Sequence, residues 1–117
     1  MVSLAASTQL FGAQLLQEEH LRAIRKAAFR HVELFASPGH FDWQDRRTVM
    51  RIRAALRALG LNVCSLHAPW APGQDVASLD ALCRQRSLEA VARAMDALVA
   101  VGGDVLVMHP GAAVQDR

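Results

Sequence analysis

The sequence lacks the features that are typical of membrane proteins, of secreted proteins and of proteins with cysteine-based zinc or redox motifs. Its two cysteines, Cys64 and Cys83, do not have the spacing of a zinc or redox motif, which favours a reduced intracellular chain. The first residues contain no basic segment before an apolar run, which argues against a signal peptide. No apolar run approaches the ~20 residues that span a bilayer, because Asp104 and two glycines interrupt the best one. A soluble, cytoplasmic protein is therefore expected.

An excess of charge of one sign is also absent. The 117 residues carry a net charge of +2, and charged residues of both signs are mixed along the chain, which argues against disorder. All but one of the 13 basic residues are arginines, the exception being Lys26, and they are spread along expected helices as solvated faces. With 52% hydrophobic residues, the chain is long enough for one domain with a core and too short for two.

Motifs for nucleotide binding and for serine hydrolysis are missing as well. The segment ASTQLFGAQ, which follows the first expected strand, matches neither G-x-G-x-x-G nor a P-loop. This argues against a nucleotide-binding open sheet. The sequence also has no G-x-S-x-G motif and no Ser-His-Asp pattern.

What the sequence does contain is a regular alternation of strand and helix patterns. Short apolar runs predict strands at 2–6, 31–36, 61–67 and 104–109, typical of parallel strands buried on both faces. These strands begin 29, 30 and 43 residues apart, which is the length of βαβ units. The alternation predicts a parallel α/β sheet, and both an open doubly wound sheet and part of a (β/α)8 barrel are compatible with it.

Three amphipathic helices are predicted between the strands, each with an apolar stripe. Asp45 and Ser78 are expected to cap the amino-terminal ends of the second and third helices, and Gly60 is expected to end the second. The expected stripes are Leu21, Ile24 and Ala28 in the first helix, Val49, Ile52, Leu56 and Leu59 in the second, and Leu88, Val91, Ala92, Met95, Leu98 and Val99 in the third.

Two histidines occupy equivalent positions at the exits of predicted strands. His67 closes the third strand in NVCSLHAPW and His109 closes the fourth in DVLVMHPG, and a turn with proline follows each. Because parallel strands end at one edge of a sheet, the two imidazoles are expected on one rim. Imidazole is a common ligand of Zn²⁺ and related metals, so the pair predicts metal ligands. The alternative is that each ring is hydrogen-bonded to a carbonyl, and two ligands do not complete a catalytic zinc site.

Two further residues are candidates for substrate contacts. Glu33 lies inside the apolar run at 31–36, where a charge indicates either a functional carboxylate inside a barrel or a strand end near solvent. Trp70, in the loop after the third strand, is expected either to cover a substrate or to pack that loop. His40, in the loop after the second strand, either overhangs the same rim or is a surface loop residue, and the second is expected. The remaining candidates are expected to have no part in the chemistry: His20 on a helix, His31 at the opposite end of a strand and Cys64 facing a helix or the core.

The segments AAFRHVELF, ALGLNVCSLHAPW and AVGGDVLVMHPG resemble, in order and spacing, the first half of the xylose isomerase-like TIM-barrel superfamily. This group includes sugar phosphate isomerases and epimerases and the endonuclease IV type of apurinic-site nuclease. The resemblance implies an α/β fold in which residues 1–117 are a single partial domain, the parallel (βα)3β portion of a (β/α)8 barrel. It also implies a divalent metal (Zn, Mn, Mg or Co) in the full-length parent and a sugar or sugar phosphate as substrate.

The resemblance also implies roles for individual residues. In the endonuclease branch the histidines that match His67 and His109 are metal ligands, whereas in the isomerase and epimerase branch these positions line the substrate pocket. Glu33 matches a glutamate near the substrate. With Trp70, the expected substrate-binding set is Glu33, His67, Trp70 and His109, and the expected metal ligands are His67 and His109. The catalytic residues stay unknown, because the carboxylate ligands and the base of the later strands are not among these 117 residues.

The predicted function is that of the N-terminal part of a divalent-metal-dependent sugar (phosphate) isomerase or epimerase, with the fragment itself inactive. Two alternatives stay open. One is a fragment of a metal-dependent apurinic-site endonuclease, although no basic, aromatic-rich rim for nucleic acid is present. The other is a non-enzymatic half-barrel that pairs with a copy of itself through open strand edges. Such edges and an uncovered inner face predict poor solubility or association.

Overall fold

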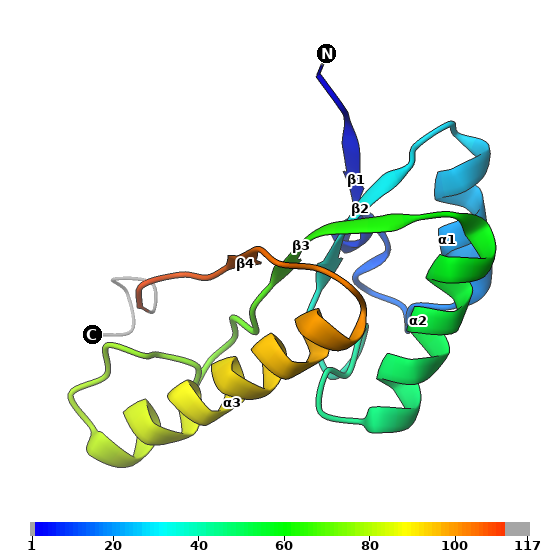
Figure 1. Ribbon diagram of the computed structural model, residues 1–117. Coiled ribbons are helices and arrows are strands. Elements are labelled where there is room, and N and C mark those ends of the chain that lie inside the picture. Colours follow the sequence, from blue (N-terminus) through cyan, green and yellow to red (C-terminus); the bar gives the residue numbers. More distant parts are fainter. Residues whose placement is uncertain (1, 112–117) are drawn as a thin grey trace.

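Four parallel strands form one sheet in the computed structural model, which describes residues 2–111 (Figure 1). The strands are β1 (Ala5–Ser7), β2 (His31–Phe35), β3 (Asn62–His67) and β4 (Leu106–Val107). A 3-10 helix, η1 (Thr8–Phe11), follows β1, and the connecting α-helices are α1 (Glu18–Lys26), α2 (Arg46–Leu59) and α3 (Ala81–Ala100). The predicted parallel α/β fold is thereby confirmed.

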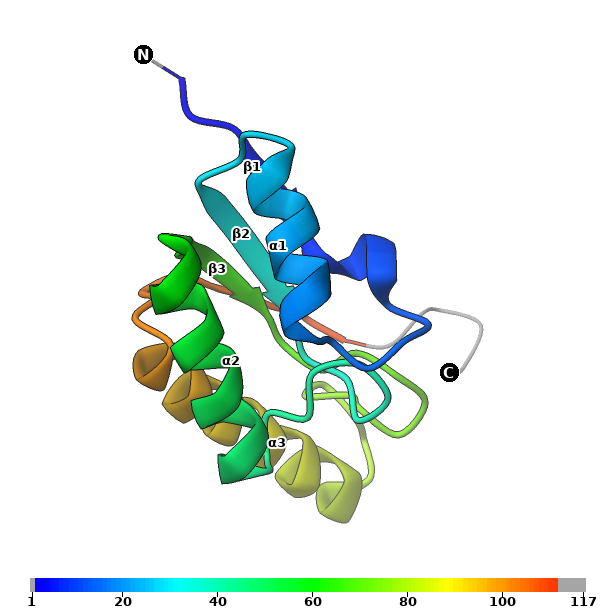
Figure 2. The ribbon, with the colours of Figure 1, turned by 90° about the vertical axis from the view of Figure 1, so that its right-hand side faces the viewer.

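The order of the strands decides between the two predicted architectures. The order is β1-β2-β3-β4, without a reversal. Right-handed crossovers between successive neighbours then place every helix on the same face of the sheet, whereas a doubly wound sheet requires a reversal of order. Figure 2 shows α1, α2 and α3 following one another along the sheet, and α1 contacts α2 as α2 contacts α3. The arrangement is that of part of a (β/α)8 barrel.

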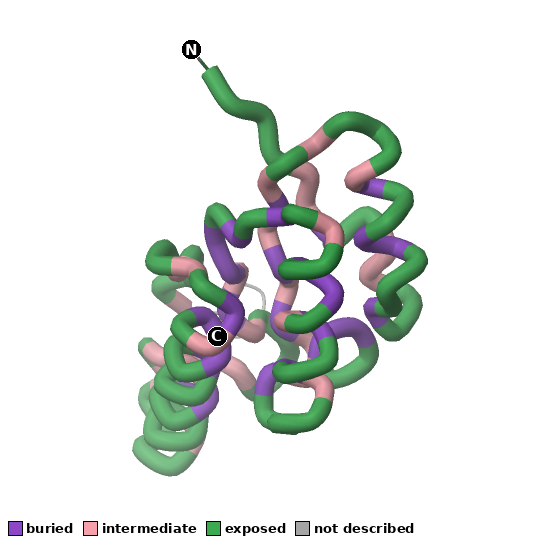
Figure 3. Tube along the Cα trace, turned by 45° about the vertical axis from the view of Figure 1, so that its right-hand side comes forward, coloured by how far each residue is buried: buried purple, intermediate pink, exposed green. Residues whose placement is uncertain are grey.

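The core lies between the helices and one face of the sheet. Val32 and Leu34 of β2 and Val63 and Leu66 of β3 are buried beneath the helices. The alternate residues of β2, which include Glu33, are only half-buried, because nothing covers the other face of the sheet in the described residues. Figure 3 shows the buried segments gathered between helices and sheet. The open face corresponds to the interior of a closed barrel.

Both edge strands are shorter than predicted. β1 begins at Ala5 rather than at residue 2, and the side chains of Val2 and Leu4 are exposed. β4 contains only Leu106 and Val107 of the predicted 104–109. An edge strand has a partner on one side only, so it is ordered as a strand only where that partner lies alongside it.

Two of the three predicted helix-end signals are confirmed. The Asp45 side chain accepts hydrogen bonds from the backbone N–H and the hydroxyl of Thr48 at the start of α2. Gly60 ends α2 in the left-handed conformation with φ 66°. The third prediction is wrong: Asp80, not Ser78, caps α3 by accepting from Leu82 N–H. The Ser78 hydroxyl is instead used just before the helix, where it accepts from the backbone N–H of Asp80.

The apolar stripes of α1 and α2 face the core largely as predicted. Leu21 and Ile24 are buried in α1, but Ala28 lies beyond the end of that helix with φ 72° and is exposed. In α2 all predicted stripe residues are buried except Leu59, which is half-buried next to the carboxyl end.

The predicted stripe of α3 is wrong for most of its members: Leu98 is buried and Val91 is half-buried, but the other four residues are exposed. The buried face of α3 consists mainly of small residues: Ser87, Ala90, Ala94, Ala97 and Leu98. The large residues Leu88, Met95 and Val99 point to solvent. Small side chains allow α3 to lie close against α2 and β3, so the inward face of this helix cannot be identified from the size of its apolar residues.

No helix among residues 2–111 is both long enough and apolar enough to span a membrane. The cytoplasmic location stays a prediction.

Candidate functional site

The exits of β3 and β4 bring two imidazoles together. His67 is the last residue of β3 and His109 lies two residues beyond β4, and the two strands run side by side in the same direction (Figure 1). The centres of the two rings are 5.1 Å apart, with 51° between their planes. The two side chains therefore lie together at one edge of the sheet, as expected. Their roles as metal ligands stay a prediction.

The hydrogen bond of His67 determines which of its nitrogens is free. Its Nδ1 lies 2.7 Å from the carbonyl oxygen of Ala68. A carbonyl oxygen only accepts hydrogen bonds, so Nδ1 carries the proton and donates. In the neutral ring the lone pair then resides on Nε2, which has no protein partner among the described residues. Holding one nitrogen of the ring in this way is how proteins orient a histidine whose other nitrogen binds a ligand.

Two aromatic side chains flank the imidazole pair. The ring of Phe35, at the end of β2, lies 5.2 Å from that of His67, measured between ring centres. Trp70 stacks on His109 with 4.1 Å between ring centres and 16° between planes, and it keeps 45% of its surface exposed. Both alternatives predicted for Trp70 are compatible with this position, because it packs its own loop against the exit of β4 and still presents surface beside the imidazoles.

Glu33 lies one layer below this row of rings, on the same open face of the sheet. It is the central residue of β2, so the alternative that it marks a strand end is wrong. The Ser65 hydroxyl donates to Glu33 Oε2 over 2.5 Å. Phe35 and His67 are paired two residues closer to the carboxyl ends of the strands, which is a distance of about 7 Å at ~3.3 Å per residue. A small ligand lying along the strands can therefore contact both Glu33 and the rings above it.

A bulge in β3 creates the contact between Ser65 and Glu33. The register pairs Val32 with Val63 and then Glu33 with Ser65, which leaves Cys64 as the extra residue. Cys64 is exposed, so the prediction that it faces a helix or the core is wrong. The bulge is the physical reason, since it breaks the alternation of faces along β3. No local pattern in the sequence marks this bulge.

His40 is buried, and its prediction as a surface loop residue is wrong. Its side chain is 1% exposed and fully hydrogen-bonded. Nδ1 donates to the carbonyl of Gln14 over 2.8 Å, and Nε2 lies 3.0 Å from the hydroxyl of Thr8. Thr8 Oγ1 also accepts from the backbone N–H of Phe35 over 3.2 Å. His40 thus connects the exit of β1 to the exit of β2, next to Phe35.

His20 also has a structural task, in line with its lack of a predicted role in the chemistry. Its Nδ1 accepts from the backbone N–H of Gln17 at the start of α1, and its ring stacks on Phe11 at 4.7 Å. His31 opens β2 at the end of the sheet opposite to the imidazole pair. Both cysteines are free, Cys64 being exposed and Cys83 half-buried.

The donor set at the rim is incomplete for a catalytic metal. Residues 2–111 contain no group of three or more His, Cys, Asp or Glu side chains placed to hold an ion. A catalytic zinc typically has three protein ligands and one open position. Residues 2–111 can supply two of these three protein ligands, His67 and His109, and do not supply a complete catalytic site.

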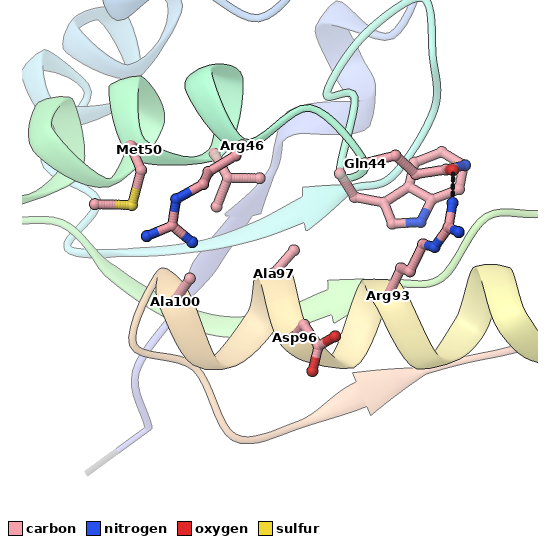
Figure 4. Close-up of a pocket in the computed structure, with 9 residues that line it drawn as sticks. Gln44, Arg46, Met50, Arg93, Asp96, Ala97 and Ala100 are labelled. Atoms are coloured by element: carbon pink, nitrogen blue, oxygen red, sulfur yellow. Dashed lines mark hydrogen bonds between the residues drawn. The ribbon is translucent and has the colours of Figure 1, made fainter.

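A hollow of about 200 Å³ lies elsewhere, between α2 and α3 (Figure 4). Trp43 lines it, and Arg93 at its rim donates to Gln44 over 2.8 Å. Asp96 points away from Arg46 in Figure 4, so the groove does not combine these charges into one binding site. None of the residues predicted for the functional site lines this hollow.

The chain is similar to proteins of known fold over most of its length. Residues 21–117 match the sequence model of the xylose isomerase-like TIM barrel family. L-ribulose 3-epimerase superposes with a TM-score of 0.75 and 20% identity over 97% of this chain and 37% of that one. The 3-keto-D-glucoside 4-epimerase YcjR from E. coli superposes with a TM-score of 0.70 and 18% identity over 91% of this chain and 37% of that one. No curated protein is significantly similar in sequence.

A further neighbour is the TTHB071 protein from Thermus thermophilus, in a structure soaked with ZnCl2. It superposes with a TM-score of 0.70 and 21% identity over 95% of this chain and 40% of that one. At these identities the superpositions establish the fold alone. The chain spans about two fifths of the length of these proteins, 37–40%.

Proposed function

The chain belongs to the xylose isomerase-like TIM barrel family, and from this premise we propose that it forms the N-terminal part of a divalent-metal-dependent sugar (phosphate) isomerase or epimerase. The observation that carries the proposal is the pair of imidazoles at the exits of β3 and β4, 5.1 Å apart, with Glu33 on the same face. The neighbours named as sugar epimerases support a sugar substrate in preference to abasic DNA.

The four predicted substrate-binding residues can each contact a sugar; they are Glu33, His67, Trp70 and His109. The Nε2 lone pair of His67 and the ring of His109, whose centre lies 5.1 Å from that of His67, can bind a cation or accept a hydrogen bond from a hydroxyl. The free oxygen of the Glu33 carboxylate can accept a hydroxyl hydrogen while Ser65 holds the other oxygen. The exposed part of the Trp70 indole provides an apolar surface beside them.

These residues bind and orient, and they do not complete a catalytic site. A divalent ion held by His67 and His109 would supply a Lewis acid that polarises the carbonyl and the neighbouring hydroxyl of a sugar. The two imidazoles would supply part of its coordination, and residues 2–111 place no third His, Cys, Asp or Glu side chain with them. The resemblance assigns the other ligands and the base that moves the proton to later strands of the barrel. We therefore expect the chain alone to bind a metal through His67 and His109 and to have no epimerase activity.

Calorimetric titration of Zn²⁺ into the chain tests the ligand assignment. The wild type is expected to bind one Zn²⁺ per His67–His109 pair. His67→Ala and His109→Ala are each expected to weaken binding by about tenfold or more, because each removes half of the donor set. His31→Ala is the matched control, since His31 lies on the same sheet at the opposite end and should leave the titration unchanged.

Equal zinc affinities in the wild type and both rim variants would contradict the assignment. Binding of a ketose or ketose phosphate in the presence of Zn²⁺ can be followed in the same way with Glu33→Gln. This variant keeps the size of the side chain and removes the carboxylate charge. It is expected to weaken sugar binding and to leave zinc binding unchanged, because Glu33 lies one layer below the imidazoles.

A further inference from the structure

Three polar side chains form one row across the open face of the sheet, below the imidazole pair. The register pairs Ser7 of β1 with Glu33 of β2, and Glu33 with Ser65 of β3. We call these three residues the serine–glutamate row. Ser65 donates to one oxygen of the Glu33 carboxylate, and the Ser7 hydroxyl accepts from the backbone N–H of Gln9, so its own hydrogen is available to a ligand. The row therefore offers an acceptor and a donor, both suited to hydroxyl groups.

The charge of the row is negative, and no cation in the described residues balances it. The ion pair found in residues 2–111 joins Arg22 to Glu18 on the exposed side of α1 and does not involve Glu33. All Lys and Arg residues except Arg30 and Arg117 lie on α1, α2 and α3. Arg30 precedes β2 at the end of the sheet opposite to the imidazole pair, and Arg117 lies outside the described residues. An anionic group beside Glu33 therefore meets a like charge without a compensating cation.

The loops at the carboxyl ends of the strands are also unsuited to an anion. Asp42 and Asp45 lie between β2 and α2, and Asp75 and Asp80 lie between β3 and α3. Each carboxylate accepts a hydrogen bond from a backbone N–H of its own segment. Asp45 and Asp80 do so at the amino ends of α2 and α3, where backbone N–H groups commonly bind phosphate. At both helix ends a carboxylate thus takes the place that a phosphate would need.

We propose that the site takes an uncharged ketose and rejects the corresponding sugar phosphate, and that Glu33 makes this distinction. The inference rests on the proposed function and narrows the substrate class of that same site. A sugar held at the imidazoles and extending along the strands reaches Glu33 after about 7 Å, at ~3.3 Å per residue. A sugar hydroxyl can donate to the carboxylate, whereas a phosphate carries roughly 1.5–2 negative charges at pH 7 and repels it.

The orientation of the sugar chain does not change this choice. A chain that points into the sheet places its end beside Glu33. A chain that points out of the site places its end among the loops whose helix ends are occupied by Asp45 and Asp80. In either direction a terminal hydroxyl is accepted more readily than a terminal phosphate, because the nearby charges are negative.

Glu33→Gln should change the binding of the two ligand types in opposite directions. The amide has the same size as the carboxylate and keeps one acceptor oxygen, but it has no charge. An uncharged ketose loses a charge-assisted hydrogen bond and binds more weakly. The phosphate loses a like charge and binds more tightly. Damage to the fold would instead weaken the binding of both ligands.

Titration of the metal-free chain with D-fructose and with D-fructose 6-phosphate, followed by amide NMR shifts at pH 8, tests the inference. Without metal the phosphate cannot bind to an ion, and at pH 8 imidazoles are mostly neutral. Fructose is expected to bind about tenfold or more tightly than its phosphate, and Glu33→Gln is expected to narrow this ratio from both sides. Asp96→Asn is the matched control, because it removes a negative charge at the hollow between α2 and α3 and should leave the ratio unchanged.

Three results would overturn the inference. Equal binding of the two ligands, or tighter binding of the phosphate, would do so and leave the proposed function standing, because a sugar still binds. A shift of both ligands in the same direction in Glu33→Gln would show that Glu33 does not select by charge. Binding of neither ligand would also overturn it, because the serine–glutamate row consists of protein groups and needs no ion. The zinc titrations of the wild type and the rim variants test the proposed function separately.

Discussion

Replacement of Thr8 by valine tests the network that supports the rim. Thr8 is completely buried, and its hydroxyl both accepts from the backbone N–H of Phe35 and lies within 3.0 Å of His40 Nε2. Because Nδ1 of His40 donates to a carbonyl, Nε2 of the neutral ring is an acceptor, so the hydroxyl hydrogen must point to it. Valine has the same shape and can satisfy neither partner.

The expected loss of stability follows from the two groups left without a partner. A buried donor or acceptor that loses its hydrogen bond costs about 1–3 kcal/mol, and the Phe35 N–H and His40 Nε2 both do so. The extra methyl group of valine returns about 0.8 kcal/mol through burial. We therefore expect Thr8→Val to lower the free energy of unfolding by about 1–5 kcal/mol, a large part of the roughly 5–15 kcal/mol typical of a domain.

Urea unfolding, followed by far-ultraviolet circular dichroism at a concentration where the chain is monomeric, measures this loss. Thr8→Ser is the matched control, because it keeps the hydroxyl and should retain both hydrogen bonds. Thr48→Val removes a hydroxyl whose bond to Asp45 is exposed to water, so its effect should be smaller than that of Thr8→Val. If Thr8→Val is no more destabilising than these two variants, the network does not hold the two strand exits together and the reasoning fails.

Two further predictions concern the ends of α2. Gly60→Ala should lower the free energy of unfolding by about 1 kcal/mol in urea unfolding, because φ 66° is strained for any residue with a Cβ, although the Cβ itself has space. The hydrogen bond from the Thr48 hydroxyl lowers the pKa of the Asp45 carboxyl below its usual 3.8, so the charged cap is favoured in the folded state. The stabilisation by the charged cap is fully present above the usual pKa and is lost as the pH falls through the lowered pKa of the folded state. Asp45→Asn should therefore differ most in stability from the wild type near neutral pH and least in strong acid. Thermal unfolding at several pH values checks this, and a stability difference that does not change with pH would contradict it.

Local signals in the sequence predicted the parts of the fold that depend on neighbouring residues. Asp45 and Gly60 end α2 as predicted, because a cap needs only a side-chain acceptor or a left-handed backbone within one turn. The positions of His67 and His109 at two strand exits also follow from the alternation of elements, and a parallel sheet brings such exits to one edge. Hence the position of the candidate site could be predicted from the sequence alone.

The predictions that failed depended on contacts between distant segments. The burial of His40 results from partners 26 and 32 residues away, Gln14 and Thr8, and no pattern near His40 indicates them. The inward face of α3 was misjudged because it consists mainly of small residues, which a search for large apolar residues at helical spacing does not find. Cys64 was misplaced because a bulge, which is a property of strand pairing, reversed its face.

The amino-acid sequence by itself determined the alternation of strands and helices, the caps of α2 and the two histidines at strand exits, because each depends on periodicity or on bonds within a few residues. Only the tertiary structure decided that the strands follow one another without reversal, that Ser65 donates a hydrogen bond to Glu33, and that α3 turns most of its large apolar residues outward. The physical reason is that these features depend on contacts between segments that are distant in the sequence, and these contacts are fixed only when the chain is packed.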